Sequence, residues 1–166
     1  MASFSQPTGL TLNHVNAGFV AGTTSTYTTT AGTAFSINGK FGTTLATQTN
    51  TASPTLDANT GLAFTAIAYD NCACLVWGTT LAGVIAVCQG PIVATAAGVT
   101  TTVGAFIAAP QFPALPENFC PMAYQIVRVA PTGSSFTTGV TNWTASGISC
   151  TVMKNISNLP DRPQIA

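Results

Sequence analysis

A proline-rich stretch that leads directly into an apolar run constrains the fold of this chain more than any other feature. Residues 110–121 (PQFPALPENFCP) contain four prolines, which fix φ and remove backbone N–H donors, so we predict an extended or turning connector here. Residues 122–130 (MAYQIVRVA) are almost continuously apolar and predict a buried strand. Phe112, Leu115 and Phe119 are expected to fold back from the connector as a lid over the sheet that contains this strand.

Turn signals elsewhere in the chain separate short segments with strand character. Asn38-Gly39 lies between two such segments and is the preferred pair for a two-residue β-hairpin, because both positions accept positive φ. A second hairpin, at the centre of the sheet, is predicted from residues 72–77 and 84–88. Since no 3.6-residue apolar period occurs, the predicted fold class is all-β, an antiparallel β-sandwich or barrel-like domain.

The remaining segments complete the predicted domain organisation. Residues 1–20 are expected to form an extended arm, and residues 21–166 a single β domain that includes the lid. Within it, residues 48–59 have loop composition and are expected to project. We expect an edge or solvent-facing strand over 23–30, buried side chains at Leu62, Phe64 and Ile67 in a strand-rich stretch over 61–69, and further strands over 91–94, 103–109, 136–143 and 147–152.

Charged residues make up only 5% of the chain and sum to a net charge of zero, whereas about 25% is usual in soluble domains. A protein that stays free and monomeric relies on surface charge, so this composition favours packing against other subunits. The alternative is a secreted, threonine-rich β domain. Only four cations are present and they are scattered, which argues against nucleic acid as a partner. The eight charged residues are Lys40, Asp57, Asp70, Glu117, Arg128, Lys154, Asp161 and Arg162.

Neither a membrane span nor a secretion signal is predicted. The most apolar region, residues 81–109, is interrupted by Gln89-Gly90-Pro91 and by three consecutive threonines at 100–102. Residues 1–7 lack the cationic and apolar parts of a signal peptide. We therefore expect synthesis in a reducing cytoplasm.

Five cysteines, an odd number in a chain without a secretion signal, predict buried free thiols rather than a disulfide framework. Cys72 and Cys74 share one strand face, and Cys88 lies across the predicted hairpin from them. A disulfide between Cys74 and Cys88 stays open as an alternative. No metal site is predicted, because zinc sites generally have four ligands and the only histidine, His14, is remote in sequence. Cys120 and Cys150 complete the set.

No catalytic, cofactor-binding or metal-binding residues are predicted, and we expect a protein that is not an enzyme. His14 has no neighbouring acid or nucleophile, and the spacing of the four carboxylates suggests no catalytic pair. Trp77 and Trp143 are expected to be core or interface aromatics within strands, although aromatic residues of this kind also stack on sugars or bases. Glycosylation sequons at Asn142 and Asn155 are expected to be inert without a secretory route.

Several segments resemble small virion proteins of tailed bacteriophages. They are residues 109–116 with 119–124, residues 141–148 with 159–164, and the hairpin at 37–41. The resemblance extends over about residues 33–164 and rests on structural rather than catalytic motifs.

Members of this family look like capsid decoration or cement proteins. The resemblance implies an all-β protein, homotrimeric, that binds the major capsid protein on the outer surface of the virion and stabilises the mature head. It implies no cofactor, no membrane and no nucleic-acid partner. A tail or head-fibre component that contributes to host adsorption through the 48–59 loop is the alternative, and a small virion glycan hydrolase is a third possibility.

Overall fold

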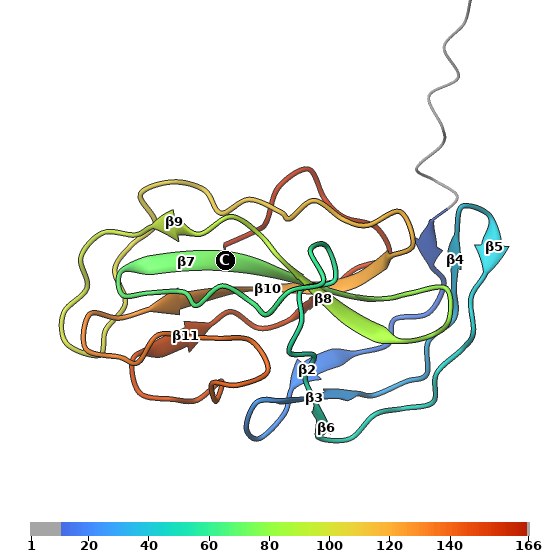
Figure 1. Ribbon diagram of the computed structural model, residues 1–166, viewed down its shortest axis with the longest axis horizontal. Helices are drawn as coiled ribbons and strands as arrows, with labels where there is room; N and C mark the ends of the chain where they lie inside the picture. The colour runs from blue at the N-terminus through green and yellow to red at the C-terminus, as the bar shows by residue number, and fades with distance from the viewer. Residues whose placement is uncertain (1–10, 166) are drawn as a thin grey trace, which may run out of the picture.

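The computed structural model describes residues 11–165, which fold into twelve β-strands arranged in three antiparallel sheets (Figure 1). None of the described residues forms a helix, and hence none forms a helix of the length and apolarity that a membrane span requires. The predicted all-β class is confirmed, and the sheets stack as a sandwich.

The central sheet has six strands, and its two longest lie at its middle. β7 (Asn71–Thr79) and β10 (Cys120–Val129) pair antiparallel from Thr79↔Cys120 to Cys72↔Arg128. This confirms the strand predicted after the prolines, but β10 already begins at Cys120. Pro121 is accommodated because the register shifts beside it, which relieves the ladder of its missing donor. β8 (Ile85–Gln89) and β9 (Val93–Ala94) pair with β7, and β11 (Ile148–Cys150) and β12 (Lys154–Asn155) with β10.

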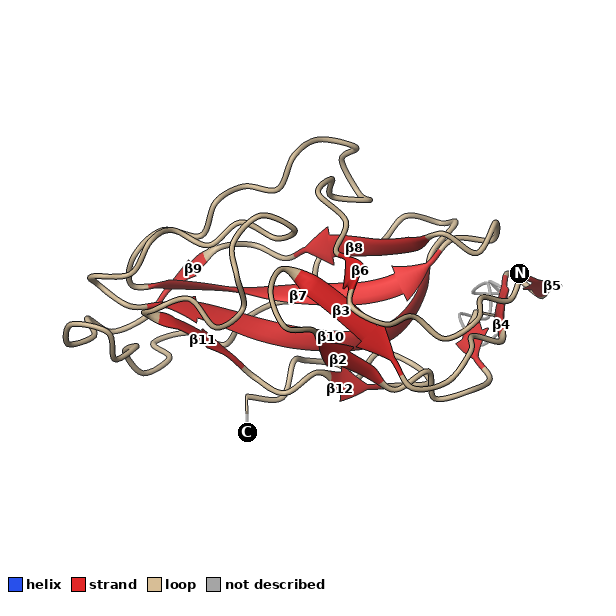
Figure 2. Ribbon diagram, turned by 90° about the horizontal axis from the view of Figure 1, so that it is seen from below, coloured by secondary structure: helices blue, strands red, loops and turns tan. Residues whose placement is uncertain are grey.

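Two three-stranded sheets complete the fold. One contains β2 (Phe19–Ala21), β3 (Thr26–Thr29) and β6 (Thr51–Ala52), and it covers one face of the central sheet (Figure 2). Aromatic rings join these layers: the Trp77 ring centroid lies 5.4 Å from that of Tyr27, 6.0 Å from that of Phe19 and 6.1 Å from that of Trp143. The other sheet contains β1 (Leu12–Asn13), β4 (Phe35–Ile37) and β5 (Lys40–Phe41).

The opposite face of the central sheet is covered by segments that are not strands. The proline-rich lid and the chain that follows β12 run above it in Figure 1. The Phe112 ring makes an edge-to-face contact with Tyr124 at 5.1 Å between centroids, and Phe119 is buried in the same cluster. The predicted lid is confirmed over residues 110–119. Because both faces of β7 and β10 are buried, these strands read as nearly continuous apolar runs rather than alternating ones.

The Asn38-Gly39 hairpin is confirmed. Ile37 pairs with Lys40 across the turn, and Asn38 and Gly39 both adopt positive φ, 49° and 76°. This is the geometry of a type I′ turn, in which the twist of the turn matches that of the strands. The predicted central hairpin is confirmed as β7–β8.

Two predictions are wrong at the threonine-rich end of the chain, the projecting loop over 48–59 and the edge position of the strand predicted over 23–30, which forms as β3. Residues 48–59 do not project as a loop: Thr51 and Ala52 form β6, and the Ala58 N–H donates to the Val87 carbonyl at 2.9 Å. β3 is therefore the central strand of its sheet rather than an edge. Within the arm predicted over 1–20, residues 12–13 form β1 and residues 19–20 belong to β2. Residues 1–10 of that arm lie outside the described residues.

Other strand predictions fail because side-chain contacts replace backbone pairing. Residues 61–69, 103–109 and 136–143 take part only in isolated bridges, which are Leu56↔Ala63, Ile67↔Phe136 and Thr95↔Phe106. Phe106 is held by Arg128, whose guanidinium lies 4.7 Å from the ring centroid, and Trp143 sits in a turn. Phe64 and Ile67 are buried as predicted, but Leu62 is 69% exposed.

Candidate interaction surface

Half of the charged side chains are buried or partly buried. Arg128 stacks on Phe106 and donates an Nη1–H to the Gly104 carbonyl at 3.1 Å. Asp57 is buried and accepts the Asn59 N–H at 2.8 Å. Asp70 is partly buried and accepts the Gly98 N–H at 2.9 Å. With Lys154 also partly buried, the exposed charges are Lys40, Glu117, Asp161 and Arg162.

Large apolar side chains occupy much of the surface that charged residues leave. Phe41 is 82% exposed at the tip of the β4–β5 hairpin, and Val152 is 81% exposed beside the central sheet. Isolated exposed apolar residues are ordinary in soluble proteins, but here they greatly outnumber the exposed charges. The exposed large hydrophobic residues are Val15, Val20, Phe41, Leu56, Leu62, Tyr69, Val84, Val99, Ile107, Val140, Val152 and Ile165. Such a surface suits contact with other subunits.

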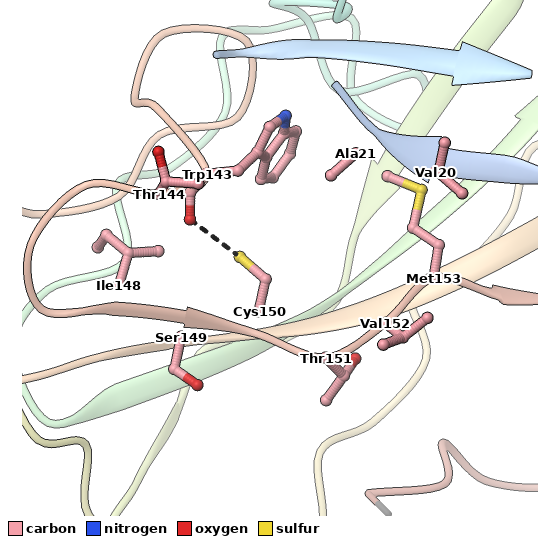
Figure 3. A pocket seen from close by; sticks show the side chains of 10 residues that line it. All are labelled: Val20, Ala21, Trp143, Thr144, Ile148, Ser149, Cys150, Thr151, Val152 and Met153. Carbon is pink, nitrogen blue, oxygen red and sulfur yellow. Dashed lines mark hydrogen bonds between the residues drawn. The ribbon is translucent and has the colours of Figure 1, made fainter. Parts of the chain in front are cut away.

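A groove of about 540 Å³ lies between β2, an edge strand of the β2–β3–β6 sheet, and β11, an edge strand of the central sheet (Figure 3). In Figure 3 Cys150 and Met153 point into the space toward Trp143 and β2, and the Cys150 Sγ lies 4.0 Å from the Trp143 carbonyl oxygen. The described residues that line the groove are uncharged: Val20, Ala21, Trp143, Thr144 and residues 148–153.

The Asn155 side chain binds the backbone of β2, a strand that lines this groove. Its Oδ1 accepts the Phe19 N–H at 2.7 Å, and its Nδ2 donates to the Phe19 carbonyl at 3.0 Å. The β12 segment is thereby joined to the edge strand β2. The amide of Asn155 thus has a structural role, whereas the other sequon residue, Asn142, accepts bonds from the backbone N–H and hydroxyl of Thr144.

The five thiols are free, as predicted, and four of them are buried. Burial raises the pKa of Cys74, Cys88, Cys120 and Cys150 from 9.0 to about 12, and it also raises the pKa of Cys72, which the Arg128 charge partly offsets. Because the thiolate is the reactive form, these cysteines behave as small hydrophobic side chains. The alternative of a Cys74–Cys88 disulfide is wrong, since both thiols are free.

The polar residues considered for catalysis lie apart from one another in structural roles. His14 Nε2 is 3.1 Å from the Ser36 hydroxyl, and its ring lies 5.7 Å from that of Phe41. Asp57 and Asp70 bind backbone N–H groups in turns, as described above. Within residues 11–165 no group of three or more His, Cys, Asp and Glu side chains is placed to hold a metal ion.

Both tryptophans are buried, as predicted. Trp77 lies in β7 at the centre of the aromatic cluster. Trp143 is not in a strand; its indole N–H donates to the Thr26 carbonyl at 2.8 Å and so ties its turn to β3. The indole ring of Trp143 also borders the groove, whose two sides were not identified from the sequence because residues 20–21 and 143–153 are distant along the chain.

The described residues thus form a small all-β protein whose exterior carries few charges and many exposed apolar side chains. Comparison with known protein families, with curated proteins and with solved structures found no match to the chain.

Proposed function

We propose that this chain is a structural protein of a tailed-bacteriophage virion, a capsid decoration or cement protein that binds the major capsid protein lattice and stabilises the mature head. One observation carries the proposal: exposed large apolar side chains far outnumber exposed charges. The resemblance of residues 33–164 to small virion proteins supplies the particular assembly.

Lattice stabilisation follows from mass action. A protein that binds the assembled shell, and does not bind its dissociated subunits, lowers the free energy of the shell by its binding free energy. Many symmetric copies make this effect collective, and a homotrimer would engage several lattice subunits at once. An apolar, charge-poor surface favours such contacts because few charges lose their hydration when it is buried.

The alternative role, a tail or head-fibre component in host adsorption, loses its main structural support. The 48–59 segment proposed as the adsorption loop is attached to the sandwich through β6 and the Ala58–Val87 hydrogen bond. Its two exposed apolar neighbours, Leu56 and Leu62, fit subunit contact equally well.

The proposal is tested by the copy number of this chain in purified heads and purified tails, measured separately by quantitative mass spectrometry. A decoration role requires hundreds of copies on heads, in a fixed ratio to the major capsid protein. A few copies confined to tails would refute it and support the adsorption role. Absence from both fractions would refute any role in the virion.

A mutational test uses Phe41, which is 82% exposed at the hairpin tip, and Lys40 beside it. Phe41→Asp should reduce head occupancy if the hairpin contacts the lattice, because a charge would be buried in the contact. Lys40→Gln is the matched control, since it changes an exposed residue of the same hairpin without adding a buried charge. Equal occupancy for the two variants would exclude the hairpin from the contact.

A further inference from the structure

The strand β2 presents unpaired backbone groups to the groove. In an antiparallel pair, alternate residues direct their N–H and C=O groups toward the partner strand and away from it. Phe19 directs both groups away from β3, to Asn155, and Gly22 donates its N–H toward Thr26 at 2.8 Å. Ala21, two residues after Phe19, therefore directs its N–H and C=O outward as well, and they have no partner among the described residues.

The strand β11 of the central sheet also presents unpaired backbone groups to the groove. The Gly147 carbonyl accepts the Ala130 N–H at 2.8 Å, and the Thr151 N–H donates to the Ile126 carbonyl at 2.9 Å, so these alternate residues face β10. Cys150 lies at an intervening position, opposite Val127, and directs its N–H and C=O away from β10. The Ile148 N–H, at the other outward position, donates to the Ala145 carbonyl at 3.0 Å, so β11 is open at Cys150. Two open edge positions, Ala21 of β2 and Cys150 of β11, thus border one groove.

An open edge of this kind favours the addition of another strand. Proteins usually protect such edges with charged side chains, prolines or a covering segment. Here the described lining is uncharged, and the apolar side chains of Val20 and Val152 are exposed at its rim. An extended peptide would gain main-chain hydrogen bonds from the edge, and alternate side chains would enter the groove.

Residues 1–10 (MASFSQPTGL) have the chemistry of such a peptide. None of their side chains is charged, which matches the lining of the groove, and Ala2 and Phe4 alternate with Ser3 and Ser5. This period of two would place an apolar face toward Trp143 and Met153. Pro7 would end the pairing, because it has no N–H to donate.

The position of β1, which follows residues 1–10, favours a second copy as the source of the peptide. β1 lies toward one end of the long axis of the molecule and β11 toward the other (Figure 1). We propose that the groove between β2 and β11 binds residues 2–6 of a second copy of this chain as an added strand. The inference concerns contacts between copies of this chain and does not rest on the proposed virion role.

Photo-crosslinking tests this exchange in the full-length purified protein. Phe4 is replaced by benzoylphenylalanine in unlabelled chains, which are mixed with ¹⁵N-labelled unmodified chains, irradiated and mapped by mass spectrometry. We expect crosslinks from position 4 of light chains to residues 143–153 of heavy chains, and weaker ones when the probe replaces Ser3, whose side chain would point away. Crosslinks only within single light chains would overturn exchange between copies, and crosslinks absent from the groove would overturn the site.

Two aspartate variants of exposed valines provide the matched control. Val152→Asp places a charge at the groove and should lower the heavy–light crosslink yield at least about tenfold, because the charge would be desolvated under the added strand. Val84→Asp alters a similarly exposed valine that does not line the groove and should leave the yield unchanged. Equal crosslink yields for the two variants would overturn the proposed binding site of the peptide.

Discussion

The two hydrogen bonds between the Asn155 side chain and the Phe19 backbone, here called the clasp, provide a quantitative test of how the sandwich is held together. Asn155→Ala removes both hydrogen bonds to the Phe19 backbone, which lie between β12 and the edge strand β2. Phe19 itself is fully buried in the aromatic cluster beside Trp77, so its N–H and C=O have limited access to water.

The expected loss of stability follows from leaving the N–H and C=O of Phe19 without a hydrogen-bond partner. An unsatisfied buried donor or acceptor costs about 1–3 kcal/mol, so the pair sets a range of about 2–6 kcal/mol. Since the groove brings water near this strand edge, we expect the lower part of the range, about 2–3 kcal/mol. For a domain of this size that corresponds to a fall in Tm of roughly 4–12 °C, at about 2–4 °C per kcal/mol.

Urea denaturation followed by tryptophan fluorescence measures the change, with Asn158→Ala as the control. Asn158 is exposed, and its side chain accepts only the neighbouring Leu159 N–H, at 2.9 Å. With an m-value of about 2 kcal/mol per M, Asn155→Ala should lower the urea midpoint by about 1–1.5 M. If the two variants differ by less than about 0.5 kcal/mol, the clasp does not stabilise the sandwich.

Three further perturbations test other parts of the fold. Gly39→Val should lower the free energy of unfolding by about 1–2 kcal/mol or more, because a β-branched residue resists the φ of 76°; an unchanged Tm would contradict this. Gln125→Met should raise it by about 1 kcal/mol, because the buried amide of Gln125 has no hydrogen-bond partner within residues 11–165. A loss of stability would show that the amide is satisfied. The urea midpoint should stay level up to about pH 9 and fall above it. The reason is that thiols of the unfolded chain lose their protons near pH 9, whereas those of the folded protein have a pKa of about 12. A level midpoint at pH 10 would contradict the burial of Cys74, Cys88, Cys120 and Cys150.

The features that could be predicted from the sequence are those encoded over short stretches. The Asn38-Gly39 turn is determined by two residues that accept positive φ. β7 and β10 are apolar throughout because both of their faces are covered, and the prolines of residues 110–119 exclude regular pairing whatever surrounds them. These local signals were sufficient for the fold class and for the lid.

The features that could not be predicted depend on partners far away in the chain. Thr51 and Ala52 have no strand signal of their own and pair only because β3 is next to them. Trp143 is buried from a turn because its indole N–H reaches the Thr26 carbonyl. The groove depends on where two edges end: neither Ala21 nor Cys150 shows in its own sequence context that its backbone is left unpaired.

The small number of exposed charges would also determine how this protein meets a binding partner. Lys40 and Arg162 balance Glu117 and Asp161, and Asp161 and Arg162 are adjacent, so little electric field extends beyond the Debye length of about 8 Å at physiological ionic strength. Encounter is then unsteered, with association rates of about 10⁵–10⁶ M⁻¹s⁻¹ that hardly change between dilute buffer and concentrated salt. Contacts made by such a surface would survive osmotic and ionic shifts that dissociate assemblies held by charge.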